Sequence, residues 1–491
     1  MSHSSQQPPQ PQTSPSTSDA LQLSRRDLLF GSAVHLGGIS LACLLNADGW
    51  AQDAPPSGNS KQLPHFKPRA RQVIFLNMVG GASQLDMFEH KPLLRKFDGT
   101  PLPESLTQGE RFAQVDPRST VYSSPYEFQR SGQAGMWVSS LLPSFPDITD
   151  DICMIRSLRC KEINHPSAQL LLQTGFPRGG RPSIGAWLSY GLGTENANLP
   201  AYVVLRSGAV QFCGQECISN GFLSGRHHGL VLNSKGEPVY YLNNPPGMTR
   251  KVRGLTIDAI SRINQNRHAL VNDPEIQTRI SQYELAFQMQ TAVPELTDFS
   301  GEKAATFKMY GIQDARTPFA RNCLMARRLI ERGVRFVQLD HGDWDLHNSL
   351  ETHLPRLCRE TERACVALVK DLKQRGLLDS TLVIWGTEFG RTPMRQEPFD
   401  RTQIRQDTIG RGHHKTFTIW MAGGGLKAGF LYGETDEFGY APISNSMEIH
   451  DLQATILHLL GIDHTKFTFQ LRGRSYRLTD IGGTVHSELF A

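Results

Sequence analysis

The chain has 491 residues, a formal net charge of +4 and acidic and basic residues that are interspersed. This composition gives no electrostatic basis for binding nucleic acid. The eight cysteines suggest no disulfide framework. Cys213 and Cys217 are candidates for a bridge or for metal ligation, but no second cysteine pair completes a zinc pattern.

The N-terminal segment predicts export. Residues 1–20 are rich in Ser, Gln and Pro and indicate a disordered leader. Residues 21–51 carry Arg25-Arg26, a moderately apolar stretch and small residues at its end, as in a twin-arginine signal peptide. We therefore expect a periplasmic protein that folds before it meets the twin-arginine export machinery, with no transmembrane segment in the mature chain.

Two alternatives for this segment are weaker. A transmembrane anchor needs about 20 strongly apolar residues, and polar residues and glycines between Ser32 and Ser40 interrupt this run. Cys43 is a poor lipid acceptor, because Ser40 stands where such signals carry Leu.

After the signal, roughly 430 residues remain, which is within the range of one large α/β domain. The apolar run 71–79, ending in Gly80-Gly81, predicts a buried parallel strand that enters a tight loop. A second strand over 150–158 leads to a helix that begins near Pro166. Residues 200–310 contain Gly, Asn and Pro loops and a helix over 273–290, and we interpret them as an elaboration on the main sheet.

From residue 315, helical and strand patterns alternate. The predicted elements are helices over 315–332, 349–375 and 451–461 and strands over 334–339, 381–387 and 416–422. The pattern predicts a single α/β domain over 65–491, with a mostly parallel sheet flanked by helices.

Three clusters of acidic residues and histidines lie near the C-terminal end of this region, QLDHGDWDLHNSLETH (338–353), WGTEFGRTP (385–393) and GRGHHK (410–415). Two of them directly follow predicted strands, where parallel α/β folds place their chemistry. Their carboxylates and imidazoles are ligands for a borderline divalent metal such as zinc or manganese. These residues are Asp340, His341, Asp343, Asp345, His347, His353, Glu388, His413 and His414.

Several segments together resemble one large bacterial family, the twin-arginine-exported domain-of-unknown-function family 1501. They include GGASQLDMFEHKP, INHPSAQLLLQTG, RNCLMARRLIERGVRFVQL, LVIWGTEFGRTP and WMAGGGLKAGFLYGETDEFG. The resemblance runs from about residue 65 to the end. It implies a fold of the alkaline phosphatase and sulfatase superfamily, but the family itself has no firmly assigned reaction.

The resemblance also implies roles for individual residues. Active members of the superfamily use a nucleophile at a helix N-terminus and one or two metals. NHPSAQLLLQTG is similar to the sulfatase motif, with Asn164 at the nucleophile position. Because Asn is not a nucleophile, His165 or Ser167 substitutes for it, metal-bound water attacks instead, or the protein is not a hydrolase of this type. Arg391, from the basic stretch 391–415, is the third candidate catalytic residue. The implied metal ligands are Asp86, Asp345, His347, Glu388, His413 and His414. The metal would be zinc, manganese or calcium.

This family pattern is incomplete here. Gly412 stands where the family usually has Asp, and Leu346 where it has a second histidine. Glu388 has a structural alternative, a buried ion pair with Arg391. The arginines of the stretch 391–415 are interpreted either as a solvated loop or as a collar for an anionic substrate. His227-His228 lies in a glycine loop without acids and is interpreted as structural.

These observations leave three hypotheses for function. The first is an exported, metal-dependent hydrolase of sulfate or phosphate esters, acting on an anionic ester or polysaccharide. The second is a non-catalytic binding or assembly protein on a degenerate phosphatase-like fold, and the third, weaker one is a metal-dependent mutase or transferase. No glycine-rich motif indicates a nucleotide cofactor.

Overall fold

The computed structural model describes residues 63–107, 116, 119–209, 213–233, 237–240, 242–313, 317–397 and 408–491. The predicted leader and signal peptide lie outside this part of the chain. Among the helices within it, none is both long enough and apolar enough to cross a bilayer.

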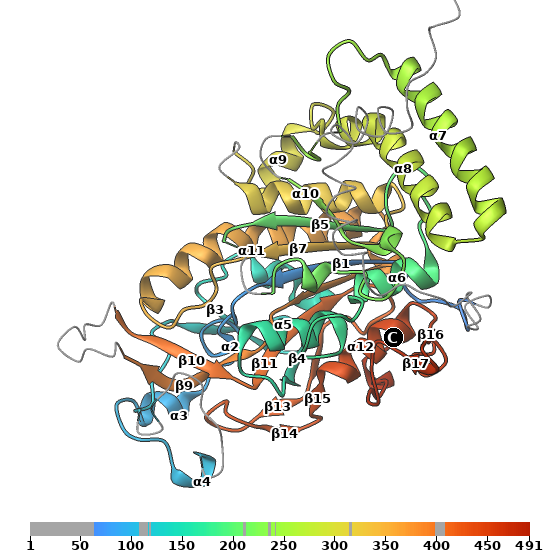
Figure 1. Ribbon diagram of the computed structural model, residues 1–491. Helices are drawn as coiled ribbons and strands as arrows, with labels where there is room; N and C mark the ends of the chain where they lie inside the picture. Colours follow the sequence, from blue (N-terminus) through green and yellow to red (C-terminus); the bar gives the residue numbers. More distant parts are fainter. Residues whose placement is uncertain are drawn as a thin grey trace, which may run out of the picture.

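The centre of the fold is a nine-stranded sheet built from the described residues. The strand order is β12-β4-β11-β8-β1-β7-β5-β6, with β15 paired to β4 (Figure 1). The strands are β1 (Gln72–Met78), β4 (Ile152–Arg159), β5 (Tyr202–Ser207), β6 (Leu230–Leu232), β7 (Phe336–His341), β8 (Thr381–Gly386), β11 (Thr416–Ala422), β12 (Phe430–Tyr432) and β15 (Met447–Glu448).

Helices cover both faces of the sheet (Figure 1). On β1, Val73 and Phe75 belong to one buried cluster and Ile74 and Leu76 to the other, as expected from the two-residue period of a strand. One face carries α5 (His165–Thr174), α6 (Ile184–Leu192) and α12 (Ile449–Leu459). The other carries α8 (Pro274–Thr297), α9 (Ala304–Tyr310), α10 (Pro318–Glu331) and α11 (Leu350–Gln374).

The remaining elements are short, apart from one long helix. Helix α7 (Arg250–Val271) precedes α8 and packs on it. Four two-stranded sheets are β2 (Phe128–Ser131) with β3 (Met136–Ser139), β9 (Gly390–Gln396) with β10 (Gly410–His414), β13 (Glu434–Thr435) with β14 (Pro442–Ser444), and β16 (Phe469–Leu471) with β17 (Arg474–Tyr476). Short helices α2 (Gln84–Met87), α3 (Pro92–Lys96) and α4 (Glu104–Thr107) follow β1.

The predicted α/β class, with a mostly parallel sheet flanked by helices, is confirmed. The predicted helix over 273–290 is longer in the structure, and the sequence analysis missed α7. The region 200–310 also contributes β5 and β6 to the main sheet, so it is more than an elaboration on it.

One strand departs from the regular alternation. β11 pairs antiparallel with both β8 and β4, whereas β1, β4, β5, β7 and β8 run in one direction. Between β8 and β11, the described residues form the β9–β10 hairpin and not a helix that crosses the sheet, so the chain returns to the edge at which β8 ends. β11 therefore starts at the edge where β4, β7 and β8 end.

Candidate metal centre

Four candidate ligands reach this edge from three segments. His165 is the first residue of α5, which follows β4, and Pro166 at the next position suits a helix start. Asp345 and His347 lie in the loop between β7 and α11. His413 lies on β10, next to the start of β11.

The three imidazoles converge on one carboxylate oxygen. Asp345 Oδ1 lies 3.2 Å from His165 Nε2, 3.0 Å from His347 Nε2 and 3.4 Å from His413 Nε2. One ligand atom from each of the four residues lies within 4.8 Å of the others. Three imidazoles and one carboxylate form a ligand set that fits zinc, manganese or a related metal.

Each imidazole is oriented by a partner on its other nitrogen. His165 Nδ1 lies 2.7 Å from Glu388 Oε1, His347 Nδ1 2.6 Å from Gln396 Oε1, and His413 Nδ1 2.8 Å from the Ile163 carbonyl oxygen. Because these oxygens accept hydrogen bonds, each Nδ1 is the donor and a neutral ring keeps its lone pair on Nε2. This arrangement is typical of histidine metal ligands.

Electrostatics at the cluster follow from this geometry. Burial lowers the pKa of His413 to about 4, although Asp345 favours the protonated ring, so this ring is neutral at pH 7. Burial acts to raise the pKa of Asp345, but the three histidines, which donate to it when they are protonated, and the charge of Arg391 hold it well below its usual range. For His165, burial lowers the pKa but the bonds to Asp345 and Glu388 outweigh it and raise the pKa.

Glu388, a predicted metal ligand, contacts His165 Nδ1, on the side of the ring opposite Asp345. Its side chain is fully buried and accepts hydrogen bonds from the Gly80 amide at 3.0 Å and from Gln169 Nε2 at 3.1 Å. Burial acts to raise its pKa, but the bonds from His165 and the Gly80 amide lower it. Glu388 is thus a charged carboxylate that orients His165.

Arg391, a predicted anion contact, is also buried. It donates to Asp345 Oδ1 at 2.7 Å and to the carbonyl oxygens of Gly81 and Arg411 at 2.7 and 2.9 Å. Its ion pair is with Asp345, not with Glu388 as the sequence alternative had it. The guanidinium therefore positions Asp345 and is itself held by the surrounding backbone.

Three other predicted site residues lie outside the cluster. Asp86 forms a buried, bidentate ion pair with Arg411, with distances of 2.8 and 3.1 Å. His414 Nδ1 accepts from the Thr416 amide at 3.1 Å and its ring packs on Tyr440. Ser167 stands two residues after His165, and residues two apart do not share a helix face.

The basic stretch is neither a solvated loop nor an exposed collar where the structure describes it. Arg391 and Arg411 lie on the β9–β10 hairpin and are almost completely buried. Arg395 pairs with Asp98 at 3.4 Å. Arg401 and Arg405 lie outside the described residues.

Other residues of the first ligand cluster face elsewhere. Asp340 accepts from Asn77 Nδ2 and Gln338 Nε2, both at 2.8 Å, and His341 Nδ1 lies 2.9 Å from Ser207 Oγ. The sequence analysis missed Gln396 and the Ile163 carbonyl as partners of the ligands. A glutamine in a strand and a backbone oxygen leave no chemical signal in a sequence.

Cys213 and Cys217 are joined by a disulfide, which decides between the two alternatives left open for them. The other five cysteines of the described chain are buried free thiols. None of them belongs to the cluster of metal ligands found among the described residues.

The fold and this cluster define an α/β protein with a candidate metal centre at the carboxyl edge of its parallel strands. The chain matches, over residues 70–490, the family described as "Protein of unknown function (DUF1501)", and it belongs to that family. This confirms the resemblance drawn from its motifs. No curated protein matches the sequence.

Solved structures similar to the chain include sulfatases and alkaline phosphatases. The PsFucS1 sulfatase from Pseudoalteromonas sp. is 13% identical, with 89% of this chain and 76% of that chain covered and a TM-score of 0.33. Alkaline phosphatase from the Antarctic bacterium TAB5 is 11% identical, with 80% and 98% covered and a TM-score of 0.31. The lipoteichoic acid synthase LtaP from Listeria monocytogenes is 9% identical, with 83% and 76% covered and a TM-score of 0.33. Likenesses this distant carry no chemistry.

Proposed function

We propose that the protein binds a divalent metal through His165, Asp345, His347 and His413. One observation carries this proposal: three imidazole Nε2 atoms, each on a ring whose Nδ1 faces an acceptor oxygen, surround one carboxylate oxygen at 3.0–3.4 Å. When the rings are neutral, their Nε2 lone pairs and this oxygen repel one another unless a cation or a proton lies between them. Three nitrogens favour zinc or manganese over calcium, which takes oxygen ligands.

We further propose that the protein is an exported, periplasmic hydrolase of sulfate or phosphate esters, with an anionic ester or polysaccharide as substrate. A bound metal would supply Lewis-acid polarisation of the ester oxygens. The ten-residue helix α5 begins at the cluster, and the positive end of its dipole favours an anion there. Arg391 and Glu388 hold Asp345 and His165 in place.

The attacking group in this proposal is water. Asn164 occupies the position of the superfamily nucleophile and is not nucleophilic, His165 is engaged by Asp345 and Glu388, and Ser167 lies on another helix face. The same observation supports the second candidate function, a non-catalytic binding or assembly protein that retains the metal.

The test compares the wild-type protein with Asp345→Asn and Asp343→Asn. Both substitutions remove one negative charge from the same loop, but Asp343 is exposed and has a positive φ of 76° that Asn also tolerates. Elemental mass spectrometry of metal-replete protein should find about one zinc or manganese in the wild type and Asp343→Asn. Asp345→Asn should hold almost none.

Hydrolysis is then measured with 4-nitrophenyl sulfate and 4-nitrophenyl phosphate. Turnover that needs metal and Asp345 supports the hydrolase. Stoichiometric metal without turnover of a wider ester panel supports the binding protein, and a wild type without metal contradicts the site itself.

A further inference from the structure

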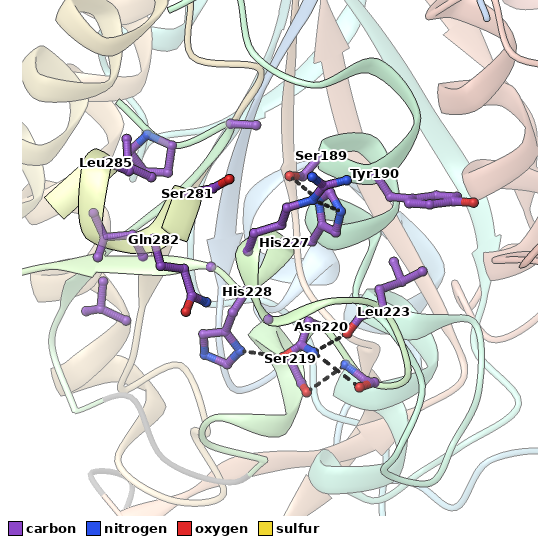
Figure 2. A pocket seen from close by; sticks show the side chains of 18 of the residues that line it. Ser189, Tyr190, Ser219, Asn220, Leu223, His227, His228, Ser281, Gln282 and Leu285 are labelled. Carbon is purple, nitrogen blue, oxygen red and sulfur yellow. Dashed lines mark hydrogen bonds between the residues drawn. The ribbon is translucent and has the colours of Figure 1, made fainter. Parts of the chain in front are cut away.

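A large cavity of about 1520 Å³ lies beside β6, the outermost strand on one side of the nine-stranded sheet. Its walls come from α6, α7, α8, β5, β6, the 3-10 helices η3 (Glu216–Ile218) and η4 (Gly225–His227) and the tip of the β16–β17 hairpin. None of the four metal ligands lines it. Figure 2 shows Gln282 of α8 facing the loop that carries His227 and His228.

The charge of the cavity is strongly one-sided. Its lining contains a single acidic residue, Glu216, and seven arginines. These are Arg181, Arg206, Arg226, Arg253, Arg279, Arg472 and Arg474. Some are neutralised within the protein: Arg181 pairs with Asp480 at 3.1 Å and Arg206 lies 3.8 Å from Asp340.

Arg253 of α7 is the informative member of this set. Only 5% of its surface is exposed, and its Nε has no hydrogen-bond partner. Among the described residues, no acidic side chain pairs with its guanidinium, and burial lowers its pKa. A buried, unpaired charge is destabilising, so its presence in a cavity wall points to a ligand that supplies the missing anion.

Two more arginines are available to an anion. Arg279 projects from α8 without an ion pair to any described side chain, and Arg226 Nε donates only to His227 Nε2, at 3.1 Å. Burial lowers the pKa of His227 to about 3, so this imidazole is neutral and leaves the charge of Arg226 uncompensated. His227 is held from its other side by Ser189 Oγ at 2.9 Å (Figure 2).

Aromatic rings share the wall with the arginines. The lining includes Phe176, Tyr190, Phe222, Tyr240, Tyr283 and Tyr476. The Arg181 guanidinium lies 4.2 Å above the Phe176 ring, and the Phe222 and Tyr476 ring centroids are 5.0 Å apart. A wall that contains both flat apolar rings and cations suits a ligand whose rings have apolar faces and which carries several anionic groups.

We propose that this cavity binds an acidic oligosaccharide that bears carboxylates or sulfates. Its volume exceeds the roughly 300–1,000 Å³ of ordinary small-molecule sites, so it accommodates several linked rings. Guanidinium groups bind carboxylate and sulfate oxygens bidentately, and the C–H faces of sugar rings pack on aromatic side chains. β6, at three residues, is too short for an acidic peptide to add a strand. This proposal does not rest on the proposed hydrolase activity.

The test is calorimetric titration of the full mature chain with tetragalacturonate, a sulfated tetrasaccharide, maltotetraose and hexaglutamate. The variants are Arg253→Met and Arg279→Gln, with Arg262→Gln as the matched control, because Arg262 is exposed on α7 and outside the cavity. At least one acidic sugar should bind the wild type and Arg262→Gln equally, and both cavity variants on the order of tenfold more weakly. Maltotetraose should not bind.

Thermal melting separates binding from folding. Because Arg253→Met removes an unpaired buried charge, the ligand-free variant should melt at a higher temperature than the wild type, while its ligand-induced shift is lost. Three results would each overturn the proposal. Hexaglutamate binds the wild type as tightly as the acidic sugars do, all three variants bind the acidic sugars as tightly as the wild type does, or neither acidic sugar binds the wild type. If Arg253→Met fails to fold, Arg279→Gln decides the outcome.

Discussion

Glu388 and His165 are joined by a hydrogen bond of 2.7 Å that links the end of β8 to the start of α5. The carboxylate is fully buried and is also held by the Gly80 amide at the end of β1. Because His165 Nδ1 donates to Glu388, its Nε2 is turned toward Asp345, 3.2 Å away. Glu388, which is not one of the four candidate ligands, therefore fixes the orientation of the candidate ligand His165.

Glu388→Gln should weaken metal binding by about 10–100-fold, because partners behind a histidine ligand set its tautomer and orientation. The affinity is measured by competition with a chelator of known strength. Glu397→Gln, an exposed position nine residues later, is the control and should bind metal as the wild type does. Equal affinities for the two variants would show that Glu388 does not act through His165.

Much of this metal centre could be predicted from the sequence, for a simple physical reason. Asp345 and His347 follow an apolar run, and parallel strands bring their carboxyl ends to one edge. His413 was found by composition, but its position depends on the β9–β10 hairpin, which reverses the chain and makes β11 antiparallel. Nothing in the apolar run 416–422 distinguishes an antiparallel strand from a parallel one.

Long-range pairing accounts for the predicted ligands that lie elsewhere. Asp86 and Arg411 are 325 positions apart in the chain, and neither residue indicates the other in the sequence. Similarly, Glu388 looked like a ligand because it follows a strand, but its side chain reaches His165, 223 residues earlier. A residue type at a strand end predicts a polar site, whereas direct ligation depends on contacts that the sequence does not encode locally.

Asp86→Ala should lower the free energy of unfolding by about 3–5 kcal/mol and leave the metal stoichiometry unchanged. Both members of the Asp86–Arg411 pair are fully buried, and removing one partner leaves an uncompensated charge. Chemical denaturation and elemental analysis provide the two measurements. The control is Asp147→Ala, which breaks an exposed pair with Lys370 and should change stability by about 1 kcal/mol or less. Loss of metal in a folded Asp86→Ala protein would restore Asp86 as a ligand.

His227 should make the protein less stable as the pH falls below neutral. Burial lowers its pKa from 6.5 to about 3 in the folded state, so between these values the unfolded chain binds more protons. The contribution of the neutral His227 to the free energy of unfolding is fully present above pH 6.5 and falls progressively toward pH 3. At pH 4 the free energy of unfolding should be lower by roughly 3 kcal/mol. Denaturation of the wild type and His227→Gln at pH 7 and pH 4 measures the difference. The variant should lose less stability between the two pH values, and identical losses would contradict the assignment.

Gly80→Ala should weaken both the fold and the metal site, because the loop holding Asp345 packs directly on the Gly80 backbone. A Cβ at Gly80 would lie 2.5 Å from the Asp345 amide nitrogen, and its φ of +123° is one that L side chains rarely adopt. Gly99→Ala is the matched control, since Gly99 has a φ of +75° but no atom within 4 Å of an added Cβ. That control should lose roughly 1–2 kcal/mol of stability and bind metal normally. Gly80→Ala should lose more stability than the control. It should also bind metal at least about tenfold more weakly, because the added Cβ displaces Asp345, one of the four candidate ligands. If both variants bind metal equally well, the close approach of Gly80 to this loop does not position Asp345.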